Sequence, residues 1–185
     1  ESAENLKIKD ADAFIKFALG ENVTRKGAQG GGGNTNPRYP ISRMGVEQVM
    51  MDAFTKAKAY DEAWKKYNAS AIKDPALAPR KDLELEALAE IINKKRFITC
   101  HSYVQSEINA TMKVAERFGF PVNTFTHILE GYKVADKMKA HGASAATFSD
   151  WFNYKTEVQD ATSYNAAIMQ KVGINTIINS DDAEM

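Results

Sequence analysis

Short apolar runs alternate with stretches of helical periodicity along this sequence, and that alternation limits its possible folds more than any other feature. Helical crossovers between successive strands require the strands to run parallel. The pattern therefore predicts an α/β fold. We expect strands near residues 13–19, 96–100, 122–126, 143–148 and 174–178, and helices near 44–67, 82–92, 102–118, 131–140 and 163–171, with Asp82 and Ser102 as N-caps.

Charge and hydropathy exclude several classes of partner. The 24 basic residues balance the 24 acidic ones, so no net field attracts nucleic acid. No apolar run approaches the roughly 18 to 20 residues that cross a bilayer, so we expect no membrane partner. The compartment stays open between cytoplasm and periplasm or secretion, because a targeting segment upstream of Glu1 would not be seen in this sequence.

Two of the three histidines follow predicted strands, where the active-site loops of parallel α/β folds begin. His101 follows the strand at 96–100 and His127 the strand at 122–126, while Asp181 and Asp182 follow the last strand. Cys100 should point to the opposite face from His101, because neighbouring strand residues alternate. The third histidine, His141, is expected at the other end of the fold, contacting carbonyl groups at a helix C-terminus.

Two neutral imidazoles and a carboxylate suit zinc or a similar divalent ion, and a carboxylate beside a metal-activated water can accept its proton. The ordered set of His101, His127 and Asp181 therefore predicts a metal site for hydrolysis. Either histidine alone would be read as an ordinary hydrogen-bonded residue at a strand end. Convergence of the three side chains distinguishes the two interpretations.

The segments TCHSYVQSEI, TFTHILEGYKVADKM and INTIINSDDAEM resemble the strand-five, strand-six and strand-eight segments of the amidohydrolase superfamily, near its imidazolonepropionase-like and prolidase-like branch. The likeness covers most of residues 96–185. It implies a partial TIM-type (β/α)8 barrel, comprising about strands four to eight. It also implies that His101 and His127 are metal ligands and that Asp181 is both ligand and general base, with Asp182 the lesser candidate.

The same resemblance implies one or two ions, zinc first, and a small amide, cyclic amide or peptide substrate. A bridging ligand often comes from an earlier strand, for which Lys16 and Glu21 are both candidates. Candidate substrate contacts are weaker. One is Arg43, or Arg38 in the same loop, and the alternative is a solvated loop arginine. The others are Asp150 and Tyr154, after the strand at 143–148, where the alternative is an aromatic wall that packs on the barrel rim without contacting a ligand.

The sequence departs from the family in lacking the His-x-His pair of strand one, and a full barrel needs eight strands. We therefore expect residues 1–185 to form a single partial barrel domain, a fragment that binds one ion weakly or none and is inactive alone. Its open edges should associate with the missing barrel half or with another copy. The alternatives are a non-catalytic α/β binding module without metal and a structural fragment whose three site residues point apart.

Overall fold

The strands pair in the order in which they occur along the chain. The computed structural model describes residues 3–6, 8, 11, 13–24, 39–149 and 152–180. Within these ranges each strand is parallel to its neighbours in one five-stranded sheet, formed by β1 (Ala13–Ala18), β2 (Arg96–His101), β3 (Thr124–Thr126), β4 (Ser144–Phe148) and β5 (Thr176–Asn179). Sequential parallel strands joined by helices are the arrangement of a partial (β/α)8 barrel, so the predicted fold class is confirmed.

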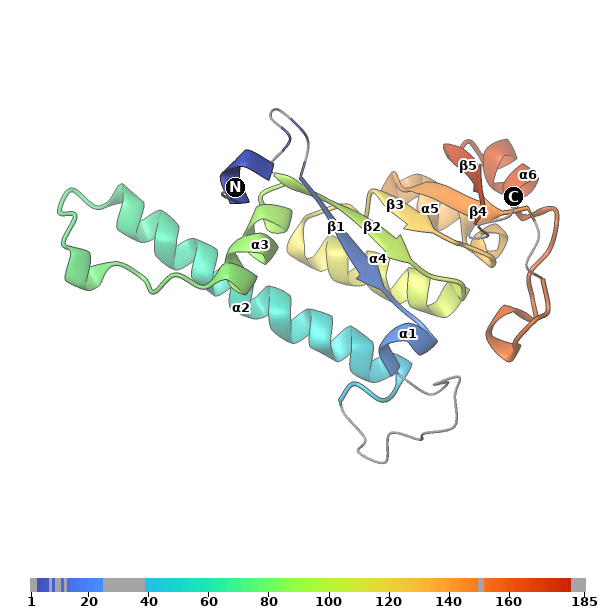
Figure 1. Ribbon diagram of the computed structural model, residues 1–185, viewed down its shortest axis with the longest axis horizontal. Helices are drawn as coiled ribbons and strands as arrows, with labels where there is room; N and C mark the ends of the chain where they lie inside the picture. The colour runs from blue at the N-terminus through green and yellow to red at the C-terminus, as the bar shows by residue number, and fades with distance from the viewer. Residues whose placement is uncertain are drawn as a thin grey trace.

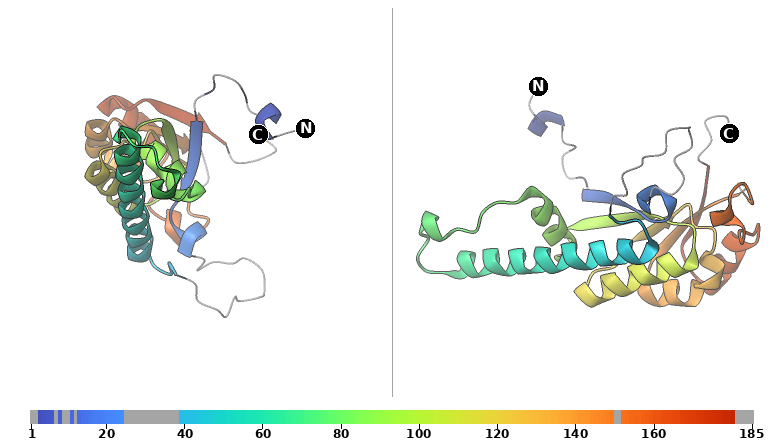
Figure 2. Two further views of the ribbon diagram at one scale, coloured as in Figure 1. Left: turned by 90° about the vertical axis from the view of Figure 1, so that its left-hand side faces the viewer. Right: turned by 90° about the horizontal axis from the view of Figure 1, so that it is seen from below.

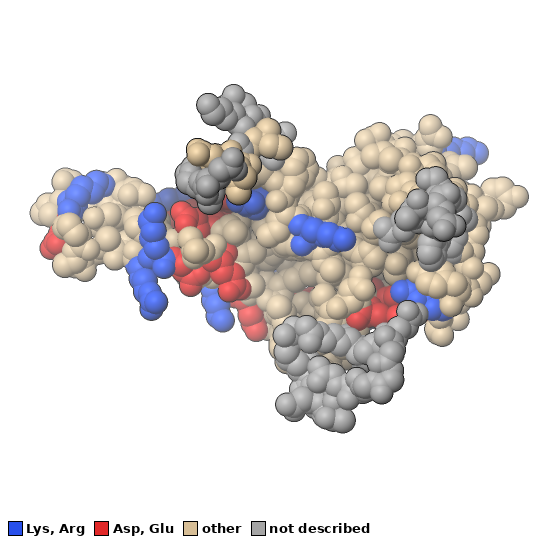
Figure 3. Space-filling view, in the orientation of Figure 1, with Lys and Arg blue, Asp and Glu red and all other residues tan. Residues whose placement is uncertain are grey.

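The long helices lie against one face of this sheet, as Figures 1 and 2 show. The other face is not covered by a helix within the described residues, and in Figure 3 it is mostly uncharged. No described helix is long and apolar enough to cross a membrane. The helices are α1 (Glu21–Thr24), α2 (Arg43–Ala69), α3 (Leu83–Ile92), α4 (Gln105–Phe118), α5 (Ala135–His141) and α6 (Asn165–Val172), with single 3-10 turns η1 (Ala3–Leu6), η2 (Pro75–Leu77), η3 (Gly131–Lys133) and η4 (Thr156–Val158).

The main core lies between the sheet and the helices. Alternate residues of β2, Ile98 and Cys100, are fully buried in it, as is Phe125 of β3. Phe54 of α2 is 1% exposed, and its ring centroid lies 4.6 Å from that of Phe120. Because strand side chains alternate between faces, burial of Cys100 on the helix side directs His101 to the other face, as predicted.

The two predicted N-caps have different outcomes. Asp82 caps α3, since its Oδ1 atom accepts hydrogen bonds from the N–H groups of Glu84 and Leu85. The prediction for Ser102 is wrong, because α4 begins three residues later, at Gln105. The hydroxyl of Ser102 donates to the Cys100 carbonyl instead, and a distant carboxylate, that of Glu130, accepts from the Gln105 N–H group at 2.9 Å.

The prediction for His141 also needs correction. This residue ends α5, as expected, but its ring is buried and does not contact helix carbonyl groups in any hydrogen bond of the described structure. Its Nε2 atom accepts a hydrogen bond from the Val122 N–H group at 3.0 Å, and its Nδ1 atom lies 3.0 Å from Glu116 Oε1. His141 therefore links α5 to α4 and to the segment that leads into β3, at the amino end of the strands.

Candidate active site

The two strand-end histidines lie together at the carboxyl edge of the sheet. His101 is the last residue of β2 and is 7% exposed, and His127 directly follows β3. Their ring centroids are 5.0 Å apart, with an interplanar angle of 59°. Separate strands thus bring two imidazoles side by side at one edge of the sheet.

Uncharged neighbours hold both rings in place. The Tyr103 ring meets the His101 ring edge to face at 4.7 Å, and the Phe148 ring stacks on His127 at 4.9 Å and 21°. The side-chain nitrogen of Asn179 lies 3.2 Å from Nδ1 of His127. We call these five residues, His101, Tyr103, His127, Phe148 and Asn179, the imidazole cluster.

The backbone at His127 is strained and locked. Its φ of 59° lies in the left-handed region, which costs most residues other than glycine about 1 kcal/mol or more. Both backbone polar groups of the next residue, Ile128, are hydrogen-bonded. Its N–H group donates to Ala146, and its carbonyl accepts from Thr147 Oγ1 at 2.6 Å and from Asn165 Nδ2 at 2.8 Å. These bonds compensate for the strain and turn the His127 ring toward β4.

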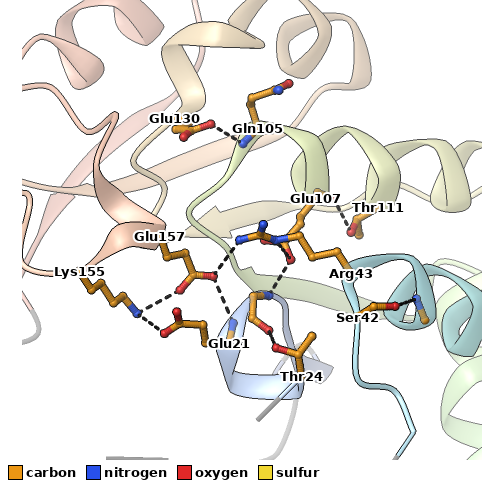
Figure 4. A network of polar contacts seen from close by, with 12 residues as sticks. Glu21, Thr24, Ser42, Arg43, Gln105, Glu107, Thr111, Glu130, Lys155 and Glu157 are labelled. Carbon is orange, nitrogen blue, oxygen red and sulfur yellow. Dashed lines mark hydrogen bonds and ion pairs between the residues drawn. The ribbon is translucent and has the colours of Figure 1, made fainter. Parts of the chain in front are cut away.

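A second polar group lies at the same edge, built around two buried carboxylates. The side chains of Glu107 on α4 and Glu157 on η4 are 5% and 2% exposed. Arg43, the first residue of α2, lies between them, with Nε 3.1 Å from Glu107 Oε1 and Nη2 3.8 Å from Glu157 Oε1 (Figure 4). With Glu21 and Lys155 these three residues form what we call the ion-pair cluster.

The ion-pair cluster clamps the end of β1. Glu107 Oε1 accepts from the Gly20 N–H group at 3.0 Å, and Glu157 Oε1 accepts from the Glu21 N–H group at 3.1 Å. Gly20 has a φ of +70°, and a Cβ atom there would lie 2.1 Å from Glu157 Oε1, so any other residue would be strained at this position. Because β1 and β4 are not neighbours in the sheet, the segment after β4 crosses the carboxyl edge to reach this turn.

Lys155 joins the two clusters. Its Nζ atom lies 3.1 Å from Glu157 Oε2, 3.6 Å from Glu21 Oε2 and 4.6 Å from the centre of the Tyr103 ring. Burial lowers the pKa of this amine, but the hydrogen bond and the charge of Glu157 outweigh it, so the pKa is raised overall. The ammonium therefore stays protonated, and Tyr103 contacts both it and His101.

Burial shifts the pKa of two further groups, Glu107 and Cys100. It raises the pKa of Glu107, and the opposing effects of Arg43 and of the Gly20 N–H group do not cancel that rise. Within the described residues, Glu107 Oε2 has no hydrogen-bond partner. Burial also raises the pKa of the Cys100 thiol far above its ordinary value, with a smaller contribution from the charge of Glu107. Cys100 is therefore a core residue, unlike the adjacent His101.

The other predicted site residues lie around the two clusters. Lys16 is exposed on the open face of β1, in register with Thr99, whereas Glu21 begins α1 and faces Lys155. The guanidinium of Arg43 is engaged by two carboxylates. Tyr154 is 48% exposed, with Lys155 Nζ 5.5 Å from its ring centre.

Four predicted residues, Arg38, Asp150, Asp181 and Asp182, lie outside the described residues. Among those that are described, no group of three or more His, Cys, Asp and Glu side chains is arranged to hold a metal ion. Of the three residues predicted as the core of the metal site, His101, His127 and Asp181, the structure therefore describes only the two histidines.

Sequence reasoning did not single out Glu107, Lys155, Glu157 or Asn179. For Glu107 a signal was present, because it lies four residues before Thr111 and seven before Val114, on the buried face of α4. A glutamate on an apolar helix face indicates a buried partner. Lys155 and Glu157 lie in an irregular segment where no periodicity marks the buried side.

Comparisons with known proteins agree with this architecture. No family model matches the sequence. The chain is 24% identical over 177 residues to the amidohydrolase tasK of Hapsidospora irregularis, covering 91% of this chain and 17% of that protein. It superimposes on the crystal structure of an amidohydrolase from Thermotoga maritima MSB8 with a TM-score of 0.75 and 25% identity, covering 97% of this chain and 44% of that one.

The chain thus spans less than half the length of either protein. Both matches extend over nearly the whole chain, and both proteins carry the same name as the family that the strand-end segments resemble. The sequence and the fold therefore relate this chain to the amidohydrolase superfamily.

Proposed function

We propose that this chain supplies one half of the active site of a metal-dependent amidohydrolase, which hydrolyses the C–N bond of an amide, a cyclic amide or a small peptide. The observation that carries the proposal is the 5.0 Å separation of the His101 and His127 rings at adjacent strand ends. A fragment with a purely structural role had been expected to hold these side chains apart. The relationship to amidohydrolases supports the same assignment.

The residues present suit a divalent ion. Imidazole nitrogens are preferred ligands of zinc, and iron and manganese also accept them. Neighbouring groups already orient the His127 ring: Phe148 stacks on it, and the Asn179 amide meets its Nδ1 atom. Asn179 Oδ1 is buried without a hydrogen-bond partner in the described structure, and after a half-turn of the amide this acceptor would take a hydrogen bond from Nδ1–H of a ligating imidazole. We therefore assign His101 and His127 as two ligands.

Asp181 is proposed as the third ligand and as the general base. It directly follows Ser180, at the end of the segment that contains β5. In this role its carboxylate accepts the proton of the attacking water and passes it to the leaving nitrogen. A divalent ion, when bound, would supply Lewis acidity to the water and to the substrate carbonyl.

A further ligand is proposed at Glu21 or Lys16, and the contacts favour Glu21. Its carboxylate faces Lys155, which lies over the Tyr103 ring beside His101, whereas the side chain of Lys16 is exposed. A lysine would also have to be carboxylated before it could bind the ion. Zinc is the first metal to test. The first subfamily to test is the branch close to imidazolonepropionases and prolidases. Arg43, Asp150 and Tyr154 stay weaker proposals as substrate contacts.

Zinc binding by single-site variants tests the assignment. We expect His101→Ala, His127→Ala and Asp181→Asn each to weaken zinc binding in calorimetry by more than the roughly 10- to 100-fold loss typical of an outer-shell partner. His141→Gln is the matched control, because His141 lies at the other end of the strands. Equal zinc affinity in all four variants would refute the assignment and favour a binding module without metal.

A further inference from the structure

Asn179 and Phe148 approach the His127 ring from adjacent strands. The two residues are paired in register between β4 and β5. The Phe148 ring stacks on the imidazole, and the Asn179 amide meets its edge at Nδ1, 3.2 Å away. One nitrogen of His127 is therefore committed to the protein, and an ion bound by this ring must use the other nitrogen, Nε2.

In the amide orientation of the structure, the contact determines which nitrogen of the imidazole carries the proton. A neutral imidazole has one N–H group and one lone pair. With Asn179 Nδ2 facing the ring, the amide donates to Nδ1, and the ring proton then resides on Nε2. A nitrogen that carries a proton cannot bind a metal, so this arrangement disfavours an ion at Nε2.

The buried oxygen of the same amide offers the alternative. Asn179 Oδ1 has no hydrogen-bond partner within the described structure. A half-turn of the amide exchanges its nearly isosteric N and O atoms. The oxygen would then accept a hydrogen bond from Nδ1–H, leaving a lone pair on Nε2. The ring stays neutral, because one proton leaves Nε2 to solvent and another is taken up at Nδ1.

We propose that Asn179 is a positioning residue whose amide rotation selects the tautomer of His127, from Nε2–H without metal to Nδ1–H with metal bound at Nε2. The inference rests on the proposed function, since it assumes an ion at His127. It assigns Asn179 no contact with the ion and no part in proton transfer to substrate. Its effect is to orient the ligand and hold the proton on the far nitrogen, as second-shell acceptors of ligating histidines do.

The first test follows the ring nitrogens by nitrogen-detected NMR of the 185-residue chain labelled at histidine. Without metal we expect the His127 signals of an Nε2–H tautomer. On addition of zinc we expect those of an Nδ1–H tautomer with Nε2 bound. An Nδ1–H tautomer in both states would overturn the proposed rotation.

The second test compares zinc affinity among variants by calorimetry. Asn179→Leu should weaken binding by about 10- to 100-fold. Asn179→Asp should retain or strengthen it, because either carboxylate oxygen accepts from Nδ1–H without rotation. Asn175→Ala is the matched control. Asn175 directly precedes β5 and is exposed, and its side-chain amide donates to Ser144 Oγ at 3.4 Å rather than to His127.

The outcomes separate this inference from the proposed function. If zinc leaves the His101 and His127 signals of the unsubstituted chain unchanged, both fall. If zinc shifts those signals but Asn179→Leu binds it as tightly as Asn175→Ala, only the role of Asn179 falls. Should Asn179→Leu fail to fold, Asn179→Asp and the tautomer measurement decide, and a loss of affinity in the aspartate variant would contradict the inference.

Discussion

The imidazole cluster and the ion-pair cluster lie at the same edge of the sheet and meet at Tyr103, but different forces hold them. In the imidazole cluster, ring contacts at 4.7 to 5.0 Å and one amide position two histidines. In the ion-pair cluster, two almost fully buried carboxylates bind one guanidinium, one ammonium and two backbone N–H groups.

Under the proposed function, the imidazole cluster binds the metal ion and the ion-pair cluster supports the fold. Buried charges are costly to leave without partners, so the ion-pair cluster contributes to stability only while it is complete. Neutral ring contacts are individually weaker, and they surround the two imidazoles of the proposed metal site. Changes of charge should therefore affect folding first, whereas changes around the rings should affect metal binding first.

The largest effect on stability is expected from Glu157→Ala. This change removes the acceptor of the Glu21 N–H group and the partner of Lys155, and it leaves Arg43 with one carboxylate instead of two. We expect a loss of about 3 kcal/mol in the free energy of unfolding, measured by urea denaturation. Glu62→Ala on the exposed side of α2 is the control. Equal stability of the two variants would contradict a structural role for Glu157.

A somewhat smaller loss is expected from Gly20→Ala. The new methyl group would meet Glu157 Oε1 at 2.1 Å while the backbone stays at a φ of +70°. We expect a loss of about 2 kcal/mol, of which about 1 kcal/mol is the left-handed backbone. In the Glu157→Ala background only the backbone part should remain. Additive losses in the double variant, by the same denaturation, would show that the two positions do not interact.

A third effect, a change in how the free energy of unfolding depends on pH, is expected from Glu107→Gln. Burial holds the pKa of Glu107 above its ordinary value of 4.5, so the folded chain binds this proton more tightly than the unfolded chain. The contribution of Glu107 to the unfolding free energy therefore falls as pH rises from the unfolded pKa through the folded one. The glutamine variant does not titrate there, so its stability relative to the parent should rise across that window.

Urea denaturation of both proteins from about pH 4 to about pH 8 measures this difference. Glu62→Gln provides the control, because Glu62 is exposed on α2. A parent that gains stability over the glutamine variant as pH rises would mean that the ion pair with Arg43, rather than burial, dominates at Glu107.

The proximity of the two imidazoles could be predicted from sequence because the features that indicate it lie within a few residues of each histidine. Each histidine directly follows a short apolar run, and parallel strands bring their carboxyl ends to one edge. The strand at 122–126 is shorter than predicted, since β3 has only three residues, Thr124–Thr126. That difference does not move His127 from the strand end.

The ion-pair cluster could not be predicted in the same way. Its hydrogen bonds join residues 87 and 136 positions apart, Gly20 with Glu107 and Glu21 with Glu157. The same limit explains the error at Ser102. A serine before a helical stretch predicts an N-cap, but Glu130, 25 residues away, binds the first N–H group of α4 instead. Long-range partners override local preferences that are worth about 1 kcal/mol.

The smallest effect is expected at Cys100, the neighbour of His101 in β2. The thiol is fully buried on the helix side of β2, and burial raises its pKa, so little thiolate forms at neutral pH and a reagent cannot reach it. We expect no labelling by a thiol-specific reagent in native conditions, with or without zinc, and full labelling in urea.

The rate at which Cys100 is labelled also distinguishes variants of the ion-pair cluster from variants of the imidazole cluster. Because Cys100 reacts only when the core opens, Glu157→Ala should raise the labelling rate in native buffer along with its loss of stability. Asn179→Leu should leave it close to that of the parent, because it changes the proton on a ring and not the packing of the core. If both variants labelled equally fast, the clusters would share one role, and the separation of binding from scaffolding would be wrong.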